Sequence, residues 1–569
     1  MPPMGVRSLV VLAPSLAAAL LFLPACAPVR PDLSVNVPDV EWRSGIGRTG
    51  ASWLRREGPG EGILVARLEG DPYTIGAAFG RLGRGRFLAQ EKYLDRLLRA
   101  MIPNDVARTA LLSLSRLRIR TMDRVIPRDL LDSIAGLADG SDDSPDAYER
   151  ILSLHALHDV SQRFVDAPAL AAACTGFLAS GPATETGGTL LARNFDFEGG
   201  AIFDREKVVS VVVPDGKIPY LAVGFSGMLG VVSGFNREGI GVALQSISGG
   251  ESGSSGLPMT LLMADVLQSA TTFEEAIARI RKAPVFVSDL ILLGDGKTGE
   301  VAVLEKTPSA FAVRRADASS AIAVSNEAQS DEVRRLGRPL PAGSTSRKRR
   351  ARMAQLLVEK APLSVSKAVD ILRDRRSATG ADLGHGNRNA IDGLIAAHSI
   401  VFDLTALRAY VAAAPHTLGA FVSVDLRDVI SRVQRPTTWL PEDPFLSSGG
   451  FQRYQYARRA LTVARALEAA QSDGWLEGAA GELERAHRLA PDFAELTGRL
   501  AELTARLGQV EGSLALFDEA LTREPGPEPL RKAFAAFRAA VAGGRPLPPP
   551  GFIPAFPNPD EQIAAAEAR

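Results

Sequence analysis

The sequence predicts an α+β fold followed by a helical C-terminal region, and three changes of pattern along the chain support this prediction. Helical periodicity dominates between Gly62 and Phe164. From Thr175 to Leu426, short β-branched or alternating runs bounded by Gly, Asp or Pro occur between longer helical stretches, as in antiparallel sheets covered by helices. Helical periodicity returns from Phe451 onward. Strand runs with helices outside them indicate a layered domain.

Length and composition are those of an ordered chain with more than one domain. Its 569 residues exceed what one hydrophobic core normally holds, so we expect two or three domains. Hydrophobic residues make up 46% and charged residues 23%, as in globular proteins. Lys plus Arg equals Asp plus Glu at 65 each, so no net charge attracts the chain to nucleic acid, and no nucleic-acid partner is expected.

The first residues have the pattern of an export signal. Arg7 precedes an apolar run over residues 9–23, and small residues follow. The letters LPAC at 23–26 resemble a bacterial lipobox, in which the cysteine is lipidated and becomes the N-terminus, although Pro24 departs from the usual small residue. We therefore predict an exported lipoprotein of the bacterial cell envelope, anchored to the membrane through Cys26. Ordinary signal-peptidase cleavage around this cysteine, or a retained apolar anchor, is the alternative.

The next segments are assigned in chain order. Residues 26–61 are polar and interrupted by proline, which indicates a tether. A strand over residues 63–68, a turn at 70–72 and a helix containing Gly76 and Gly80 begin the ordered part. The predicted divisions are a signal peptide at 1–25, the lipidated cysteine and tether at 26–61, a mostly helical pro-segment at 62–173, a catalytic domain at 174–445, a helical region at 451–545 and a Pro-rich tail at 546–569.

The C-terminal helical pattern contains one internal repeat. Pro491 in "AHRLAPDF" and Pro525 in "ALTREPGP" lie 34 residues apart. This is the tetratricopeptide period, in which stacked helix pairs end at a proline. A plain helical extension is the alternative interpretation. The tail after residue 545 is expected to be extended because it is rich in proline.

Cys174 raises a question because a lipidated Cys26 would leave it without a partner inside the chain. Structural cysteines normally pair in an exported protein, so a free thiol there indicates another role. The residues around it, "CTGFLAS" and "TLLARNFDF", are two strand-like runs joined by the hairpin signal "GPATETGG".

The hairpin places charged groups beside the thiol. Pairing Ser180 with Thr189 puts Cys174 opposite Phe195, and Arg193 becomes a diagonal neighbour on the same face. A guanidinium there favours the thiolate and lowers the pKa of the thiol. Asp196 falls on the other face in this register, so a bulge or a one-residue shift is needed to bring it round.

The hairpin sequence also resembles a known family. "CT" followed by "LLARNFDF" is similar to N-terminal-nucleophile (Ntn) hydrolases of the choloylglycine hydrolase, acid ceramidase and acyl-coenzyme A:6-aminopenicillanate acyltransferase group. The resemblance implies a four-layer αββα sandwich and self-cleavage between Ala173 and Cys174. The new N-terminal cysteine then supplies both the nucleophilic thiol and, through its α-amine, the base, so no histidine is required.

Other motifs extend the resemblance from about Gly62 to Leu426. They are "LEGDPYTIGAAFGRL", "GFNREGIGVALQ", "AVSNEAQ", "SRKRRARMAQLL" from Ser346 and the closing strands in "AIDGLIAAHSIVFDLTALRAYVAAAP". Their order and spacing are more specific than any one of them. The long segment before the cysteine and its Gly/Tyr opening favour the acyltransferase-like branch.

The resemblance implies a role for each site residue. Cys174 attacks, Arg193 stabilises its thiolate and Asp196 holds the α-amine. Asn326 and Gln245 donate to the oxyanion, although family members often have Asn where Gln245 stands, and Arg349 corresponds to a distal arginine that supports the site.

Each of these features also has a structural interpretation. A lone buried cysteine is more often a small apolar residue, and Arg193 with Asp196 could form a structural ion pair. His155, His158 and Asp159 in "HALHD" share a helix face, but no further metal ligands are evident, so no metal site is predicted. The polar loop with His385, Asn387 and Asn389 lies either at the mouth of the site or elsewhere.

The predicted function is cleavage or transfer of an acyl group at a linear amide through an acyl-Cys174 intermediate. The expected partners are a small acyl-amide or acyl-thioester substrate, the membrane through the lipid on Cys26, and a protein at the C-terminal helical region. No cofactor is expected. The alternative function is a catalytically inactive envelope lipoprotein that binds a partner through its helical repeats.

Overall fold

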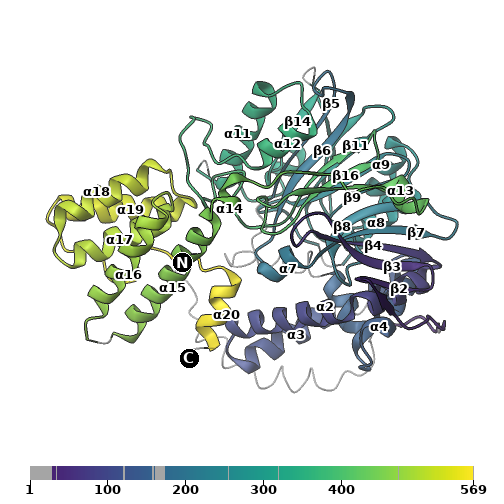
Figure 1. Ribbon diagram of the computed structural model, residues 1–569, viewed down its shortest axis with the longest axis horizontal. Coiled ribbons are helices and arrows are strands. Elements are labelled where there is room, and N and C mark those ends of the chain that lie inside the picture. The colour runs from purple at the N-terminus through teal and green to yellow at the C-terminus, as the bar shows by residue number, and fades with distance from the viewer. Residues whose placement is uncertain are drawn as a thin grey trace.

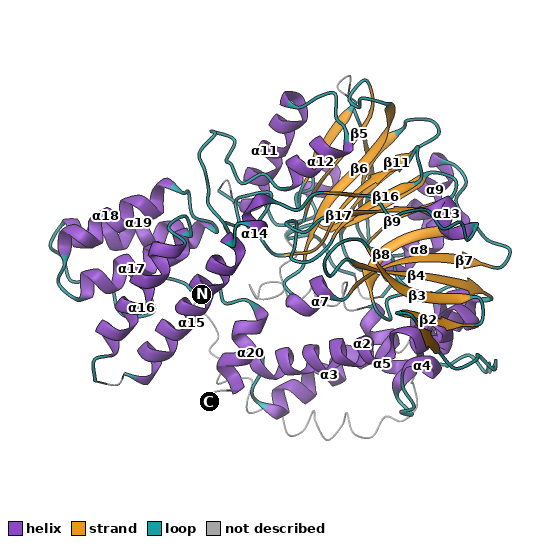
Figure 2. Ribbon diagram, viewed as in Figure 1, coloured by secondary structure: helices purple, strands orange, loops and turns teal. Residues whose placement is uncertain are grey.

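The computed structural model describes residues 28–33, 35–119, 122–156, 159, 174–253, 255–317, 320–341, 343–471 and 473–567, without the side chains of 114–119. The predicted signal peptide at 1–25, Cys26 and Ala173 lie outside the described residues. The described part contains two β-sheets flanked by helices, and a group of helices at one end of the molecule (Figures 1 and 2).

The larger sheet has eleven strands among the described residues, in the order β1-β2-β3-β4-β7-β8-β9-β10-β11-β12-β13. Its neighbouring strands are antiparallel except for β4 and β7, which are parallel. Strand β4 precedes the predicted cleavage site and β7 follows it, so the two sides of that site share one sheet. The strand bounds are β1 Glu41–Arg43, β2 Ile46–Thr49, β3 Ser52–Glu57, β4 Ile63–Gly70, β7 Lys207–Pro214, β8 Tyr220–Phe225, β9 Ser233–Asn236, β10 Ile240–Ser246, β11 Asp289–Asp295, β12 Val301–Lys306 and β13 Phe311–Arg315.

The second sheet has seven described strands in the order β14-β5-β6-β15-β16-β17-β18. Neighbouring strands of this sheet all pair antiparallel among the described residues. The β5–β6 hairpin that follows Cys174 therefore lies inside the sheet, between β14 and β15. The bounds are β5 Thr175–Gly181, β6 Gly187–Asp196, β14 Ala321–Val324, β15 Ala396–Asp403, β16 Arg408–Ala412, β17 Phe421–Asp425 and β18 Trp439–Leu440.

The two sheets pack face to face, and helices cover their outer faces (Figure 2). Phe235 of the larger sheet and Phe402 of the smaller one meet edge to face in the core between them, with ring centroids 5.0 Å apart. Helices α2 (Pro72–Met101), α4 (Arg128–Ser141), α8 (Met259–Ser269) and α9 (Phe273–Lys282) cover the larger sheet, and α11 (Thr345–Glu359) and α12 (Val365–Leu372) cover the smaller one. This arrangement confirms the predicted four-layer αββα fold.

Glycines allow α2 and α4 to pack with their backbones in contact. A Cβ on Gly76 would lie 1.9 Å from the Ser133 carbonyl oxygen, and one on Gly136 would lie 2.0 Å from the Tyr73 carbonyl oxygen. A Cβ on Gly80 would lie 2.7 Å from the Leu137 carbonyl oxygen, so both glycines noted in the sequence of this helix are packing positions. Asp71 caps α2 by accepting from Thr74 N–H at 3.1 Å.

The prediction of a tether up to residue 61 is wrong for its second half, because residues 41–57 form β1, β2 and β3 at the edge of the larger sheet. Leu54 points into the core under the helices and Trp53 into the core between the sheets. Trp53 and Leu54 are the only two consecutive large apolar residues in this segment, which is otherwise rich in Gly, Ser and charged residues. The strand therefore forms because it packs against β4, and the local sequence pattern does not predict it.

The remaining helices complete the domain that holds the two sheets and form the C-terminal group. They are α3 Asp105–Ile119, the 3-10 turn η2 Met122–Arg124, α5 Ala147–His155, α7 Ala201–Arg205, α10 Asp331–Arg334, α13 Leu426–Ile430, α14 Pro444–Ser447, α15 Gly450–Ala470, α16 Trp475–Leu489, α17 Ala494–Arg506, α18 Val510–Thr522, α19 Glu528–Ala542 and α20 Pro559–Glu567. Pro491 follows α16 and Pro525 follows α18, so each of the two prolines closes the second helix of a pair. In the described part of the chain, no helix combines the length and apolar character that crossing a membrane requires.

The prediction of an extended tail at 546–569 is wrong at its end, where α20 forms. Asn558 and Glu561 make a capping box: the Asn558 side chain accepts from Glu561 N–H at 2.9 Å, and the Glu561 carboxylate accepts from Asn558 N–H at 3.1 Å. Pro559 occupies the first helical position, where a proline is tolerated. The prolines indicated an extended tail, but here one of them begins a helix.

Candidate functional site

The β5–β6 hairpin has the register that the sequence predicts. Thr175 lies opposite Asn194, Gly176 opposite Arg193, and the same register continues to Ala179. A register shift follows between Ala179 and Gly181, at the turn. Cys174 immediately precedes β5, so the end of this hairpin fixes its position.

Cys174 is buried, with 1% of its surface exposed, and forms no disulfide with any described residue. It lies in an apolar cluster with Phe195, Phe203, Val232 and Ala397. Burial raises the pKa of the thiol above its ordinary value, and the positive charge of nearby Arg193 only partly opposes this effect. The predicted contribution of Arg193 therefore has the right sign, but the expected net lowering of the thiol pKa is wrong because desolvation outweighs it.

Arg193 is fully buried and crosses from β6 toward the larger sheet. Its Nη1 donates to the Val232 carbonyl oxygen at 3.0 Å and to Ser233 Oγ at 3.3 Å. The guanidinium lies 4.9 Å from the centroid of the Phe195 ring, and it interacts with the Cys174 thiol by hydrogen bonding and charge. Arg193 is therefore a direct neighbour of the thiol, as the register predicts.

His398 is a neighbour of the site that the sequence did not indicate. Its Nε2 lies 3.0 Å from Ser233 Oγ, and its ring stacks on Phe195 with centroids 4.9 Å apart. Burial, together with the charges of Arg193 and Lys207, lowers the pKa of His398 well below its ordinary value, so its imidazole is neutral at neutral pH. The sequence carried no signal for it because its contacts with Ser233 and Phe195 form only when distant strands come together in the fold.

The bulge expected near Asp196 falls on the partner strand instead. Ala396 lies opposite Asp196 and His398 opposite Phe195, so Ala397 is the extra residue, on β15 and not on β6. The backbone N–H of Asp196 donates to the Cys174 thiol, and the Asp196 side chain is buried. Burial raises the pKa of Asp196 to about 7, and the charges of Arg349 and Arg388 oppose this shift.

Arg349 of α11 joins three parts of the site. Its Nη1 donates to the Cys174 carbonyl oxygen at 2.8 Å and also to Thr175 Oγ1. Its Nη2 donates to Asn326 Oδ1 at 3.2 Å, and the side chain is 2% exposed. The structure therefore places the predicted distal arginine against the backbone of the cysteine itself.

The two predicted amide donors have different surroundings. Asn326 follows β14, and its Nδ2 donates to the Ser246 carbonyl oxygen at 3.1 Å while Arg349 holds its Oδ1. Gln245 directs its amide nitrogen at the Ser325 carbonyl oxygen and accepts from Gly176 N–H, both at 3.3 Å. Both ends of the Gln245 amide thus have protein partners, as do both ends of the Asn326 amide, and Gln245 joins β5 to the segment that holds Asn326. Its role as an oxyanion donor stays a prediction.

The histidine cluster near residue 155 has a structural use. His155 Nδ1 lies 2.8 Å from the Ile151 carbonyl oxygen, and its Nε2 accepts from Leu229 N–H at 2.9 Å. Both ring nitrogens therefore have backbone partners. Asp159 accepts from Met259 N–H at 3.1 Å, and His158 lies outside the described residues. Within the described ranges no group of three metal-ligating side chains occurs.

The loop with His385, Asn387 and Asn389 connects the site to the C-terminal helices. Asn387 Nδ2 donates to the Arg523 carbonyl oxygen at 2.8 Å, and Asn389 Nδ2 donates to that of Glu524 at 2.7 Å. His385 bonds to Asp492 and stacks on Phe445, with centroids 3.6 Å apart.

Arg388 of the same loop lies toward Asp196. It pairs with Glu198, and its positive charge partly opposes the rise that burial causes in the pKa of Asp196. The sequence did not single out Arg388.

The comparison with protein families supports the assignment of the central domain. Residues 183–414 match the family "Acyl-coenzyme A:6-aminopenicillanic acid acyl-transferase". The match covers less than half of the chain, and within it the chain is similar to that family. The matched range begins after Cys174 and contains the other predicted catalytic side chains, namely Arg193, Asp196, Gln245, Asn326 and Arg349.

Individual similar proteins cover about half of the chain. An uncharacterized protein of Archaeoglobus fulgidus is 27% identical over 275 residues, which are 45% of this chain and 46% of that protein. The chain thus spans less than half the length of this curated relative.

Among solved structures, an N-acylethanolamine-hydrolyzing acid amidase ortholog of Caenorhabditis elegans is 17% identical, with a TM-score of 0.33, covering 47% of this chain and all of that one. A variant of conjugated bile acid hydrolase from Clostridium perfringens is 14% identical, with a TM-score of 0.34, covering 48% and 97%. The family match and the αββα fold point to an activity of Ntn-hydrolase or acyltransferase type.

Proposed function

We propose that the chain is a self-processing cysteine Ntn enzyme that cleaves or transfers an acyl group at a linear, non-peptide amide through an acyl-Cys174 intermediate. The observation that carries the proposal is the environment of Cys174. Its thiol lies beside Arg193 and receives the Asp196 N–H, while Arg349 binds its carbonyl oxygen. A buried cysteine that serves only for packing has no need of two buried arginines.

Self-processing is the first chemical step of this proposal. The Cys174 sulfur attacks the Ala173 carbonyl carbon, the peptide C–N bond breaks, and the departing nitrogen takes up the thiol proton. A thioester then joins Ala173 to the Cys174 sulfur, and the α-amine of Cys174 is free. Water hydrolyses the thioester, which restores the thiol and leaves a carboxylate on Ala173.

The raised pKa of the thiol supports the need for a local base. A thiol with a pKa above its ordinary value is protonated at neutral pH, so attack requires a group that accepts its proton. The α-amine freed by self-processing, with an ordinary pKa of roughly 7.7 to 8.0, fits this task. The neutral His398 contacts Ser233, and the mechanism does not need it as a base.

Turnover follows the same chemistry. The thiol attacks the substrate amide carbon, and the α-amine holds the thiol proton and passes it to the departing amine nitrogen. The acyl group remains on Cys174 until water or an amine takes it. Asn326, fixed by Arg349 and Ser246, is the proposed donor to the oxyanion, an interaction worth about 3 kcal/mol in comparable sites. No step of this sequence requires a metal or an organic cofactor.

The proposed location and partners rest on the sequence. We propose an exported lipoprotein of the bacterial cell envelope with its lipid on Cys26, a small acyl-amide or acyl-thioester substrate, and a helical region able to contact a protein partner. The lipobox-like residues 23–26 support the anchor. The inactive binding scaffold is the outcome to which a failed catalytic test would point.

The test compares the two cysteines of the chain. Purified wild type, Cys174→Ala and Cys26→Ser are incubated with a panel of N-acyl amides, and the peptide containing residue 174 is searched by mass spectrometry for the added acyl mass. We expect acylation and turnover in wild type and in Cys26→Ser, and neither in Cys174→Ala. A thiol that is never acylated and reacts with no thiol reagent would favour the scaffold.

A further inference from the structure

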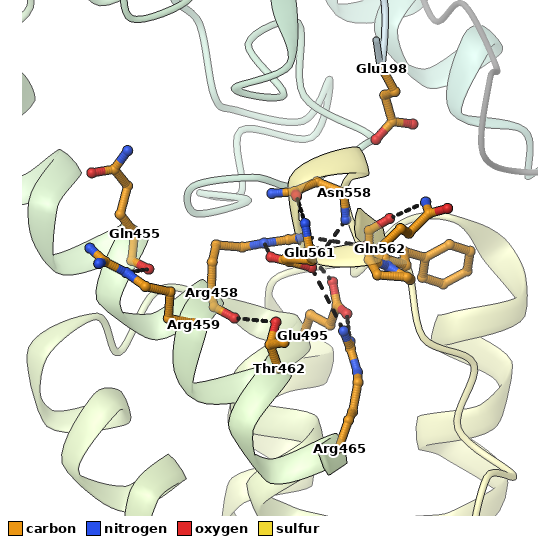
Figure 3. A network of polar contacts seen from close by, with 12 residues as sticks. Glu198, Gln455, Arg458, Arg459, Thr462, Arg465, Glu495, Asn558, Glu561 and Gln562 are labelled. Atoms are coloured by element: carbon orange, nitrogen blue, oxygen red, sulfur yellow. Dashed lines mark hydrogen bonds and ion pairs between the residues drawn. The ribbon is translucent and has the colours of Figure 1, made fainter. Parts of the chain in front are cut away.

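The C-terminal helix α20 is fixed to the helical region by a buried ion pair. Arg458 of α15 forms two hydrogen bonds with the Glu561 carboxylate, at 2.8 and 2.9 Å, and both residues are only 9% exposed. Arg458 also donates to the Phe556 carbonyl oxygen at 3.2 Å, just before the helix. Figure 3 shows this network, in which Glu495 lies between Arg458 and Arg465. A bidentate, buried pair of this kind fixes the orientation of both groups.

The same helix also contacts α2 and the start of α7. Asp560 accepts from Tyr93 Oη of α2 at 2.7 Å and from Ala201 N–H, the first residue of α7, at 3.2 Å. One carboxylate thus bridges two elements that flank the predicted cleavage site in sequence. A second contact to α2 is the exposed pair of Arg96 and Glu567, at 2.7 Å. Helix α20 lies beside α2 and α15 in Figure 1.

Tyr93 belongs to the group of aromatic side chains that reaches Cys174. Its ring meets Phe203 edge to face, with centroids 6.4 Å apart, and Phe203 meets Phe197 and Phe225 at 5.5 and 4.9 Å. Phe197 stacks on Phe195, with centroids 5.9 Å apart. Cys174, Phe195 and Phe203 lie in one buried cluster, against which Tyr93, Phe197 and Phe225 pack. A continuous series of contacts therefore links Asp560 to the thiol.

The position of Tyr93 also depends on a glycine. A Cβ on Gly200 would lie 2.0 Å from Tyr93 Oη, and Gly200 has a φ of +104°. Only glycine both adopts this backbone conformation readily and leaves room for the tyrosine. The Tyr93 ring therefore lies directly over Gly200, and Asp560 fixes its hydroxyl there.

We propose that Asp560 is a specificity-determining residue: by holding Tyr93 and the start of α7, helix α20 sets the position of the aromatic side chains beside Cys174, and thereby which acyl groups the thiol accepts. This inference rests on the proposed function. It assigns the C-terminal helix a task inside the enzyme, in addition to any partner that the helical region binds. Release of Tyr93 loosens the aromatic cluster, so that longer acyl groups are accepted and short ones are held less well.

The first experiment measures kcat and KM for a series of N-acyl amides from acetyl to palmitoyl. We expect Asp560→Ala to raise KM several-fold for the short acyl groups and to lower it for the long ones. Asp560→Asn keeps an oxygen that accepts from Tyr93 and is expected to restore most of the wild-type preference. Glu567→Gln is the matched control on α20. It removes the charge that pairs with Arg96 of α2 at the surface, and it should leave the preference unchanged.

A second experiment separates this inference from the proposed function. The alkylation rate of Cys174 by iodoacetamide, a small reagent, and by N-benzylmaleimide, a bulky one, is measured by peptide mass spectrometry without any turnover. We expect Asp560→Ala to increase the rate with the bulky reagent several-fold more than the rate with the small one. Unchanged acyl preference and unchanged alkylation in Asp560→Ala would overturn the inference. Altered alkylation in a protein that hydrolyses no amide would preserve the role of Asp560 and overturn the proposed function instead.

Discussion

Arg349 donates a hydrogen bond to the carbonyl oxygen of Cys174 at 2.8 Å, across 175 residues of sequence. The same guanidinium reaches Asn326, so one side chain orients both the proposed nucleophile and the proposed oxyanion donor. Fixing two reacting groups relative to each other is the condition under which preorganised polar groups lower a barrier.

Replacing Arg349 by lysine should slow both self-cleavage and turnover roughly 100-fold. Lysine keeps the charge but lacks the planar fork that reaches Cys174 and Asn326 together. Intact mass against time after synthesis gives the cleavage rate, and amide hydrolysis gives turnover. Arg352→Lys is the matched control, because Arg352 lies on the same helix and pairs with Asp374 away from the cysteine. Equal rates in both variants would contradict this role for Arg349.

Replacing Arg193 by methionine should raise the pKa of the Cys174 thiol further, because a neighbouring positive charge is lost. The measurement is the iodoacetamide alkylation rate of Cys174 as a function of pH. Arg193→Lys retains a charge and should give a profile closer to wild type. A methionine variant with the wild-type profile would show that the guanidinium does not act on the thiol.

Much of this hairpin site could be predicted from the sequence. The pairing of Gly176 with Arg193 follows from strand alternation and from the turn residues between the strands, and these are local properties. The order of the motifs likewise predicted that Arg349 and Asn326 belong to the site. Local pattern and family resemblance were sufficient wherever the deciding contact lies within one hairpin or one motif.

Other features could not be predicted because they depend on contacts between distant segments. The bulge lies on β15 at Ala397, two hundred residues from the strand whose geometry it changes. The net pKa shift of Cys174 follows from burial, which no local pattern reports. The helix that begins at the capping box of Asn558 and Glu561 was not predicted, because the surrounding prolines favoured an extended tail.

Asp196 should make the uncut protein less stable as the pH rises from about 4 to about 7. Its pKa is about 7 in the folded chain and about 3.9 in an unfolded one, so the folded state binds the extra proton in this window. The stabilisation from this proton is complete below the pKa of Asp196 in the unfolded chain. It is lost as the pH rises past the pKa in the folded chain, on the order of 4 kcal/mol in total.

Urea unfolding of Cys174→Ala and of the double variant Cys174→Ala with Asp196→Asn, at pH 5 and pH 8, measures this effect. Asparagine resembles the protonated acid and does not titrate, so the double variant should lose less stability between the two pH values. Identical pH dependence in the two proteins would mean that Asp196 has an ordinary pKa.

Replacing Gly176 by alanine should destabilise the domain by about 1 to 3 kcal/mol and slow self-cleavage. The added Cβ would lie 2.8 Å from the Ala192 carbonyl oxygen and 2.9 Å from Arg193 Cβ, so β5 must move away from β6 beside the thiol. Thermal unfolding and intact mass report the two effects. Gly181→Asn is the control on the same strand, because nothing lies within 4 Å of a Cβ there and asparagine tolerates its φ of +52°.

Intact mass with N-terminal sequencing of purified wild type and Cys174→Ala tests whether Cys174 becomes an N-terminal nucleophile. We expect two fragments in wild type, one of which begins Cys-Thr-Gly-Phe, and a single uncut chain in the variant. A single uncut chain in both proteins would remove the α-amine that the mechanism uses as its base, and would contradict the account.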